Sequence, residues 1–371
     1  MGLSIGPLRL DPPVVLAPMA GVTNVAFRQL CRAHGPGLFV SEMVMARALL
    51  ETNERTMRMV SFGPDEAPRS VQLYTVDPVV TGLAVRHLVA EVGVDHVDLN
   101  FGCPAAKVTK KGGGAALPVH GVLLRSIVAA AVDAAGEVPV TVKLRIGVDE
   151  RHRTFLDAGR IAEGEGAAAV LLHARTAEQL YAGDADWRAI GELKEAVTSI
   201  PVLGNGDIWE ASDALAMVVA SGCDGVVVGR GCLGRPWLFR DLADAFAGRP
   251  LLAPPDLGEV LDTMGTHARL LCDHMDERFG IRDFRKHVSW YLAGFPLGGE
   301  LRHRLAQVSS LAELDELVSS LDRSLPFPEH ALRQPRGHTN GPRAVALPHR
   351  WLETADDPTP PAGADVMASG G

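Results

Sequence analysis

The chain has 371 residues, of which 47% are hydrophobic and 22% charged, and a formal net charge of −9. These proportions are typical of a folded globular protein and exclude a disordered or fibrous chain, while the length predicts about two domains. The negative charge argues against a protein that coats nucleic acid without selectivity, although a local basic surface stays compatible with it.

Eight short β-rich runs alternate with helical stretches over the first two thirds of the chain. Alternation of this kind predicts a parallel α/β fold, and eight units match a (β/α)8 TIM barrel. An open doubly wound sheet is less favoured, because residues 17–24, APMAGVTN, stand where that fold needs a GxGxxG turn. The expected strands are residues 14–18, 38–43, 70–75, 96–102, 140–145, 169–175, 201–206 and 225–230.

Several of these expected strands carry polar side chains at alternate positions, as Gln72, Lys143 and His173 illustrate. The apolar set should pack on the surrounding helices, which leaves the polar set inside the barrel. A buried polar group without a partner costs a few kcal/mol. Because barrel active sites lie at the C-terminal ends of the strands, the pattern predicts a bound polar cofactor there.

Residues 97–114, VDLNFGCPAAKVTKKGGG, describe a strand that ends at Cys103 and a loop rich in lysine and glycine. Pro104 cannot donate to a strand ladder, so it leaves Cys103 at the C-terminal lip of the strand. A lone cysteine is more often a buried apolar residue than a catalyst. The loop itself suits the close approach of a polyanion.

Two late loops contain the glycines of a possible phosphate site. Residues 204–207 read GNGD and residues 229–237 read GRGCLGRPW. Barrels often bind phosphate between the loops that follow strands seven and eight, and Arg230 would add a charge-assisted hydrogen bond. Simple tight turns are the alternative interpretation of these glycines.

From about residue 256 the pattern indicates helices without strands, after a proline-rich link at residues 250–255. The expected helices are residues 257–279, 282–292, 299–307 and 312–321. Residues 278–304 hold six basic residues against two acidic ones, with Phe284, Trp290 and Tyr291 interleaved. Cations and aromatic rings are the two residue types that bind RNA phosphates and bases. An amphipathic helix with solvated charges explains the same pattern equally well.

The end of the chain is rich in Pro, Gly and Ala. Residues 333–352 contain four arginines and no acidic residue, so they could brace RNA or lie free in solvent. Residues 353–371 are predicted to be disordered. Five scattered cysteines without metal-binding spacing predict neither disulfides nor a metal site, and the absence of a long apolar run or signal sequence predicts a cytoplasmic protein without membrane contact.

The sequence resembles the tRNA-dihydrouridine synthases, most closely their bacterial B-type branch. The similarity runs in order from about residue 14 to residue 321. Phe101 and Ala174 depart from it, where Met and Gly are expected. The motifs that carry it are APMAGVTN (17–24), VQLY (71–74), DLNFGCPAAKVTKKGGGAAL (98–117), VKLRIG (142–147), HARTAEQLYAGDADW (173–187), GNGDI (204–208), GRGCLGRPWLF (229–239) and FRKHVSWYLAGFP (284–296).

The resemblance implies an FMN enzyme that reduces a uridine in the tRNA D-loop to 5,6-dihydrouridine and is reloaded by NADPH. Hydride would pass from reduced FMN to C6, and Cys103 would be the catalytic residue that protonates C5. It further implies a catalytic barrel over residues 1–250 and a tRNA-binding helical domain over 256–325. The composition of residues 326–371 predicts an at least partly disordered tail. We expect a monomer without a metal.

The remaining roles implied by the resemblance fall into two groups. Expected to bind FMN are Pro18, Met19, Ala20, Gln72, Lys143, His173, Asn205, Gly206, Asp207, Gly229 and Arg230. Expected to bind tRNA are Asn100, which would seat the uracil, and Lys107, Lys110, Lys111, Arg175, Arg282, Arg285 and Lys286.

Three other functions use parts of the same pattern. A dihydroorotate dehydrogenase-like FMN barrel acting on a free pyrimidine would share the phosphate loops but not need the basic helices. A Schiff-base aldolase would use Lys143 as its nucleophile. A non-catalytic RNA-binding barrel is disfavoured by the intact Cys103 and Lys143.

Overall fold

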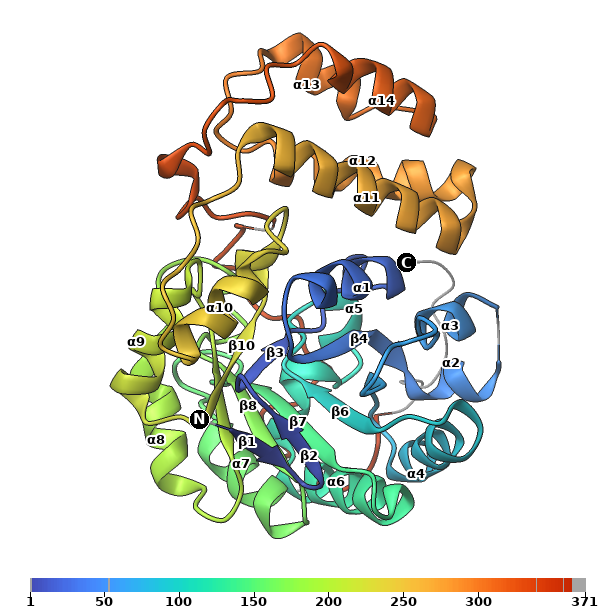
Figure 1. Ribbon diagram of the computed structural model, residues 1–371. Coiled ribbons are helices and arrows are strands. Elements are labelled where there is room, and N and C mark those ends of the chain that lie inside the picture. The colour runs from blue at the N-terminus through green and yellow to red at the C-terminus, as the bar shows by residue number, and fades with distance from the viewer. Residues whose placement is uncertain (1, 53, 338, 356, 362–371) are drawn as a thin grey trace.

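The computed structural model describes residues 2–52, 54–337, 339–355 and 357–361. Its centre is a closed barrel of eight parallel strands in the order β10-β3-β4-β5-β6-β7-β8-β9 (Figure 1). The predicted (β/α)8 fold is therefore confirmed. The strands are β3 (Val14–Leu16), β4 (Leu38–Met45), β5 (Ser70–Tyr74), β6 (His96–Phe101), β7 (Val140–Arg145), β8 (Ala169–His173), β9 (Val202–Asn205) and β10 (Gly225–Val228).

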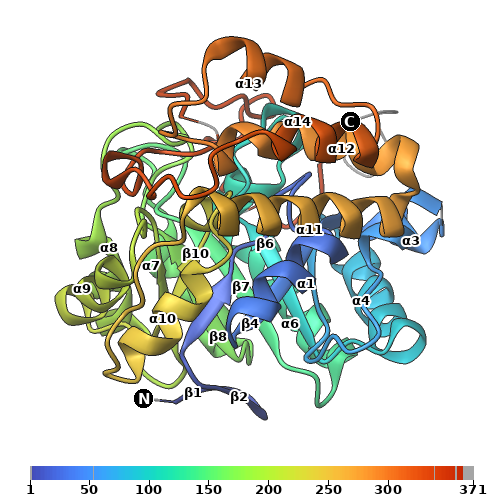
Figure 2. The same cartoon turned by 45° about the horizontal axis from the view of Figure 1, so that its top comes forward.

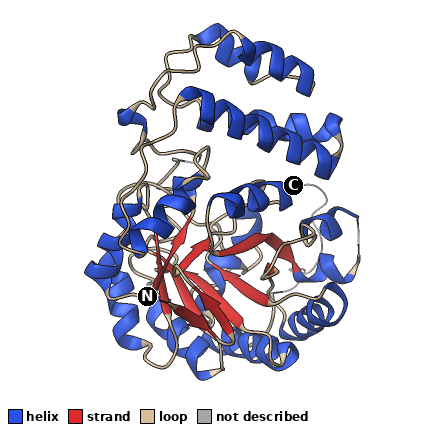
Figure 3. Cartoon of the chain, in the orientation of Figure 1, coloured by secondary structure: helices blue, strands red, loops and turns tan. Residues whose placement is uncertain are grey.

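Ten helices of the described chain connect or follow these strands and surround the barrel, as Figure 3 shows in blue around red. Their inner faces and the outward faces of the strands share one continuous apolar core. The helices are α1 (Val25–His34), α2 (Ala46–Leu50), α3 (Glu54–Met59), α4 (Pro78–His87), α5 (Ala106–Thr109), α6 (Gly121–Ala135), α7 (Phe155–Gly164), α8 (Trp187–Ala196), α9 (Ala211–Ser221) and α10 (Leu238–Phe246).

A short antiparallel hairpin closes the N-terminal end of the barrel. It consists of β1 (Leu3–Ile5) and β2 (Leu8–Leu10), and it lies at the opposite end of the barrel from the C-terminal helices (Figure 1). Its buried side chains join a core cluster with residues of β3, β4, β8, β9 and β10. The sequence did not predict this hairpin, because strands of three residues are too short to show alternation.

Inside the barrel, the neighbouring strands β5, β6 and β7 carry a buried network of hydrogen-bonded polar side chains. Ser70 Oγ lies 2.7 Å from His96 Nδ1, and His96 Nε2 lies 3.0 Å from Thr141 Oγ1. Thr141 in turn donates to Asp98 Oδ1 at 2.6 Å. All four side chains are buried, so the polar faces of these strands satisfy one another inside the barrel, as the alternation indicated.

Four further helices form a separate layer: α11 (Leu257–Met275), α12 (Glu277–Tyr291), α13 (Gly299–Leu305) and α14 (Leu311–Ser319). The prediction that the first of them reaches residue 279 was wrong. Asp276 has φ +67°, which ends α11, and its carboxylate then accepts a hydrogen bond from Phe279 N at 3.1 Å to begin α12.

These C-terminal helices pack on the barrel through α1. Ala26 and Leu30 of α1 and Trp237 share one buried cluster with the apolar faces of α11 and α12. Figure 2 shows α11 lying along α1 across the top of the barrel. The helices are thereby held beside the C-terminal ends of the barrel strands, where barrel active sites lie.

The chain then returns to the barrel instead of ending at the helices. Residues 333–337, 339–355 and 357–361, here called the C-terminal strap, run along the barrel, and Trp351 is buried. Disorder was predicted for residues 353–371, and of these, residues 362–371 lie outside the described part of the chain. Within the described part of the chain, no helix is long and apolar enough to cross a membrane.

Candidate active site

A cavity of about 450 Å³ opens at the C-terminal ends of the barrel strands. It is lined from almost every strand-end loop, from α12 and from the C-terminal strap, so it gathers residues that are far apart in the sequence. The predicted site residues that line it are Pro18, Met19, Ala20, Gln72, Asn100, Cys103, Lys107, Lys143, His173, Asn205, Gly206, Asp207, Gly229 and Arg230.

Cys103 lies two residues after the end of β6, and hydrogen bonds to its backbone hold it there. Asn100 Oδ1 accepts hydrogen bonds from Gly102 N at 3.1 Å and Cys103 N at 2.9 Å, which turns the chain sharply after the strand. The Cys103 carbonyl accepts from Ala115 N at 3.0 Å. Burial raises the pKa of the Cys103 thiol, although Arg145 and Lys107 oppose the shift, so the thiol stays protonated near neutral pH.

A buried network supports Asn100 from below. Asn100 Nδ2 donates to Gln72 Oε1 at 2.7 Å, and Gln72 Nε2 donates to Asp98 Oδ2 at 2.7 Å. Burial raises the pKa of Asp98 to about 6. The amide of Asn100 is thus engaged in placing the Cys103 backbone, and its role in seating the uracil stays a prediction.

Lys143 and His173 lie on adjacent strands and face the same cavity. Lys143 Nζ donates to Asn205 Oδ1 at 3.0 Å, and Asn205 Nδ2 donates to the Val227 carbonyl at 2.7 Å. Burial lowers the pKa of Lys143 to about 8. Burial, reinforced by the nearby cations, also lowers the pKa of His173 well below its usual value, so this imidazole is neutral.

Arg230 is fixed between two aromatic rings. Its guanidinium carbon lies 4.6 Å from the ring centre of Tyr181 and 5.1 Å from that of Trp209. Arg230 Nη2 lies 3.5 Å from Asp207 Oδ1, while Asp207 Oδ2 accepts from Arg175 Nη2 at 2.7 Å. Stacking of this kind holds the planar cation at one point of the cavity wall.

Gly206 follows β9 at a point where only glycine fits. Its φ is +132°, and a Cβ there would lie 2.6 Å from Ala185 Cβ. Gly229 follows β10, and a Cβ there would lie 3.7 Å from Ala17 Cβ and 3.9 Å from Met19 Sδ. Both glycines line the cavity, so their backbone can be approached closely by a ligand.

The charges of the cavity wall favour an anion. Four basic residues line it, Lys107, Lys143, Arg145 and Arg230, against the single carboxylate of Asp207. Asp207 is itself paired with Arg175, which lies behind the wall. Among the residues that the structure describes, no three His, Cys, Asp or Glu side chains are grouped as metal ligands. The cavity therefore suits a phosphorylated or otherwise anionic ligand.

Sequence reasoning missed Arg145 as a site residue. It is buried and donates to the carbonyls of Gly102 at 3.0 Å, Thr176 at 2.8 Å and Leu180 at 2.8 Å. It therefore ties the loop after β6 to the loop after β8. Its position two residues after Lys143 was the available signal, because both side chains point to the same face of β7.

Other lining residues had a weaker signal or none in the sequence. Trp290 on α12 lines the cavity, although only a general RNA-facing role was predicted for it. Gly337 and Asn340 of the C-terminal strap also line it. Nothing in the local sequence places these two residues near a barrel loop.

Two of the expected substrate-binding residues lie away from the cavity wall for clear reasons. The side chain of Arg175 is only 2% exposed and holds Asp207 and the carbonyls of Ala182 and Gly183. Arg285 Nε donates to the Val308 carbonyl at 2.8 Å. Arg175 is thus placed to support the loop after β9 rather than to meet RNA.

The other expected substrate-binding residues that do not line the cavity are exposed or half-buried. Lys110 and Arg282 are exposed, and Lys111 lines a small separate hollow. Lys286 is paired with Asp283 at 2.5 Å. Their contact with tRNA stays a prediction.

Comparison with known proteins places this site in a family. The sequence profile described as Dihydrouridine synthase (Dus) matches residues 15–325. The chain belongs to the dihydrouridine synthase family. That span contains all eight barrel strands except Val14 at the start of β3, and it contains α11 to α14. The resemblance of the motifs is therefore confirmed for both parts of the structure, and the C-terminal strap lies beyond the match.

Relatives with curated names agree with the family assignment. A probable tRNA-dihydrouridine synthase of Mycobacterium tuberculosis is 58% identical over 378 residues, which cover 100% of this chain and 97% of that protein. The tRNA-dihydrouridine synthase B of Pseudomonas aeruginosa is 40% identical over 319 residues, covering 85% of this chain and 94% of that protein. The expected similarity to the B-type branch is therefore also confirmed.

Among solved structures, histamine dehydrogenase from Rhizobium sp. 4-9 superposes with a TM-score of 0.52 at 12% identity, covering 90% of this chain and 64% of that chain. The 6-hydroxypseudooxynicotine amine oxidase from Pseudomonas geniculata N1 superposes with a TM-score of 0.51 at 14% identity, covering 86% and 65%. At such identities the similarity shows the fold alone.

Proposed function

We propose that this dihydrouridine synthase family member acts on tRNA, binds FMN in the cavity and reduces a D-loop uridine to 5,6-dihydrouridine, with NADPH as the reductant of the flavin. One observation carries the proposal. A protonated thiol, Cys103, and two fixed cations, Lys143 and Arg230, line the same cavity. Flavin reduction of a uracil ring needs a proton donor, a group that stabilises negative charge and a phosphate anchor.

The residues of the cavity fit the parts of FMN. Arg230 and the close backbone of Gly206 and Gly229 suit a phosphate at the ends of β9 and β10. Lys143 and Gln72 offer donors to a polar ring edge. FMN, when bound, supplies the hydride that reaches C6 of uracil. The other residues proposed to hold it are Pro18, Met19, Ala20, His173, Asn205 and Asp207.

Cys103 is proposed as the general acid of the reaction. After hydride reaches C6, the adjacent C5 must take up a proton. The Cys103 thiol, in the cavity just after the C-terminal end of β6, is the proposed donor. Its raised pKa keeps the proton on sulfur until C5 becomes basic. A thiolate nucleophile would need the opposite shift. Asn100 fixes the position of the donor through the Cys103 backbone.

Two surfaces beside the mouth are proposed to bind tRNA. The target base must leave the folded D-loop to enter the cavity, which costs a few kcal/mol and needs compensating contacts. Lys107 lines the cavity on the β6 side, and Trp290 of α12 lines it from the helical side. Residues 256–325 would thus be the tRNA-binding domain and residues 1–250 the catalytic domain of a monomeric enzyme.

The function is tested with purified protein, an unmodified tRNA transcript and NADPH. We expect a yellow protein with bound FMN that forms dihydrouridine in the transcript, detected by mass spectrometry of the digested RNA. Free uracil and dihydroorotate are tested in parallel. If either were turned over as efficiently as tRNA, the alternative of a free-pyrimidine enzyme would replace this proposal.

Flavin binding should depend on pH through Lys143. Its lowered pKa of about 8 means that the side chain is an ammonium below that pH and neutral above it. Because the ammonium attracts an anionic ligand, the affinity of the apoprotein for FMN should fall as the pH rises from about 7 to about 9. Fluorescence titration with FMN measures this, and Lys143→Met should show a flatter profile. If the FMN affinity of Lys143→Met fell with pH as steeply as that of the wild type, a group other than Lys143 would be responsible for the pH dependence.

A further inference from the structure

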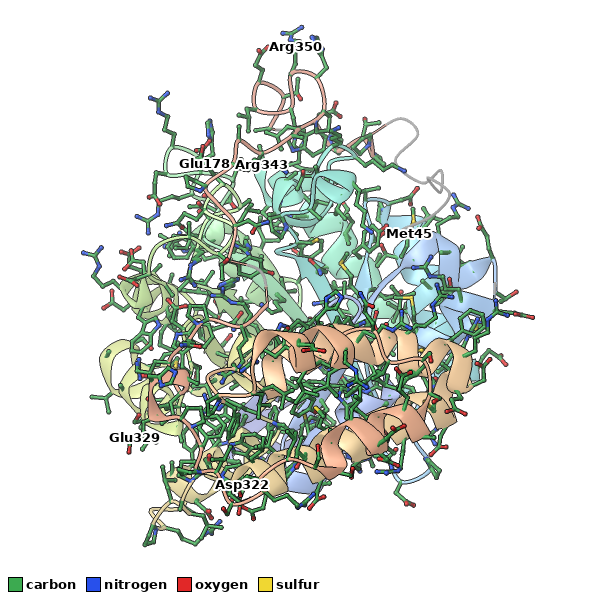
Figure 4. All side chains as sticks on the ribbon, turned by 90° about the horizontal axis from the view of Figure 1, so that it is seen from above. Met45, Glu178, Asp322, Glu329, Arg343 and Arg350 are labelled. Atoms are coloured by element: carbon green, nitrogen blue, oxygen red, sulfur yellow. The ribbon has the colours of Figure 1, made fainter. Side chains whose placement is uncertain are left out.

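The C-terminal strap touches the rim of the cavity at two distant loops. On one side, Tyr181 N donates to the Asn340 carbonyl at 3.1 Å, and Arg343 N donates to the Glu178 carbonyl at 2.8 Å. Figure 4, seen from above, shows Arg343 beside Glu178 and Arg350 farther along, on the opposite side of the molecule from the C-terminal helices. Residues 340–343 of the strap are therefore bonded to the loop after β8 that carries Tyr181.

On the other side, the strap carries a buried residue, Trp351, that packs on the loop that follows Cys103. Trp351 Nε1 donates to the Ala116 carbonyl at 2.8 Å. The indole stacks on His120 with ring centres 3.7 Å apart, and His120 Nε2 lies 3.0 Å from the Trp351 carbonyl. Trp351 is 6% exposed. This residue joins parts of the chain that are more than 200 positions apart.

Gly112 shows how closely Trp351 fits. It has φ +75°, and a Cβ on it would lie 2.6 Å from Trp351 Cη2 and 2.7 Å from Pro361 Cγ. Gly114 in the same loop has φ +55°, and a Cβ there would lie 2.4 Å from the Cys103 carbonyl oxygen. Packing and backbone conformation therefore require glycine at both positions, whether or not the loop meets a polyanion. Residues 112–116 are packed between Trp351 and Cys103.

The same short loop supports the cysteine directly. Ala115 N donates to the Cys103 carbonyl at 3.0 Å, one residue before the carbonyl that Trp351 binds. The backbone of Cys103 is thus held from two sides, by Asn100 on β6 and by residues 114–115. The second support rests in turn on the strap.

We infer that Trp351 is a positioning residue for Cys103, which it holds through residues 112–116. The strap, from residue 333 onward, lies beyond the family match, which ends at residue 325, so this support is an addition to the part of the chain that the family profile covers. The role of the cysteine as a proton donor rests on the proposed function, whereas its placement by the strap does not. Trp351 does not line the cavity, so it acts on Cys103 only through this loop.

The experiment follows the Cys103 thiol in the holoenzyme. Iodoacetamide alkylation is measured against pH by mass spectrometry of the Cys103 peptide, and hydrogen exchange is measured over residues 112–120. In Trp351→Ala we expect faster exchange of this loop, faster alkylation and an apparent pKa of Cys103 closer to that of a free thiol, because the loop no longer shields it. FMN content should be unchanged, and dihydrouridine formation should fall.

Two further variants make the test specific. Trp351→Phe keeps a ring for His120 but loses the indole N–H, so it should raise alkylation by about fivefold, the equivalent of one hydrogen bond. This variant decides the question if Trp351→Ala does not fold, which thermal unfolding reveals. Leu352→Ala changes the adjacent exposed side chain and should match the wild type.

Unchanged alkylation and exchange in the folded Trp351 variants would overturn the inference. Wild-type protein that forms no dihydrouridine, while the variants still expose Cys103, would instead refute the proposed function and leave the positioning role standing. The two failures are therefore distinguishable.

Discussion

Replacement of Cys103 by alanine should lower the rate of dihydrouridine formation by about a hundredfold to ten-thousandfold, the usual contribution of a positioned general acid. The thiol is held at the end of β6 by Asn100 and residues 114–115, and burial keeps it protonated. No other group with a transferable proton is proposed for C5. Quantification of dihydrouridine in a tRNA transcript over time gives the rate.

The variant should keep its other properties, because Cys103 is proposed to bind neither FMN nor the tRNA backbone. FMN content and tRNA affinity, measured by absorbance and by filter binding, should equal those of the wild type. Cys223→Ala is a matched control, because Cys223 is also a free cysteine, is buried just before β10 and does not line the cavity. Wild-type activity in Cys103→Ala would remove the general-acid assignment.

Replacement of Arg230 by methionine should weaken FMN binding by about tenfold to a hundredfold. The guanidinium is stacked between Tyr181 and Trp209 and faces the cavity, so its charge is fixed where the phosphate is proposed to bind. Loss of a charge-assisted hydrogen bond costs about 1.5–3 kcal/mol, which corresponds to this change. Asp207 keeps Arg175 as its partner in the variant.

Riboflavin distinguishes a phosphate contact from general damage to the cavity. Because riboflavin lacks the phosphate, Arg230→Met should change its affinity much less than that of FMN, as fluorescence titration of both ligands would show. Arg188→Ala removes an exposed arginine paired with Asp186 and should affect neither ligand. Equal losses for FMN and riboflavin would place the phosphate elsewhere.

Local patterns in the sequence were enough to predict the barrel and most of its cavity. The eight β-rich runs coincide with β3 to β10, because buried strands and their turns leave a short-range signal. The alternation in β5 and β7 placed Gln72 and Lys143 inside the barrel, and both line the cavity. The motif at residues 229–237 likewise placed Arg230 at the end of β10.

Contacts between distant segments could not be predicted in this way. Arg175 stands two residues after His173, which suggests the cavity, yet its guanidinium turns to Asp207, 32 positions later. The bond from Trp351 to Ala116 spans 235 positions. Composition suggested a disordered tail, but one buried indole and a few backbone bonds are enough to fix part of it to the barrel.

The function of the helical layer is the property that the local sequence predicts least well. Its local excess of basic residues suggested an RNA-facing surface, but Arg285, one of the expected tRNA-binding residues, and Arg302 donate to backbone carbonyls within the layer. Arg282 is exposed, and Trp290 reaches the cavity. Sequence cannot distinguish a cation that braces a helix from one that faces a substrate, because both occupy the same helical pattern.

The central claim is that reducing equivalents pass from the flavin in this cavity to a uridine of tRNA. The most direct test is a single turnover without oxygen or NADPH, in which the prereduced protein is mixed with unmodified tRNA and both flavin absorbance and dihydrouridine are followed. The account predicts that flavin is reoxidised in step with dihydrouridine, one for one, and that Cys103→Ala slows both. Flavin that stays reduced in the presence of tRNA, with no dihydrouridine formed, would contradict it.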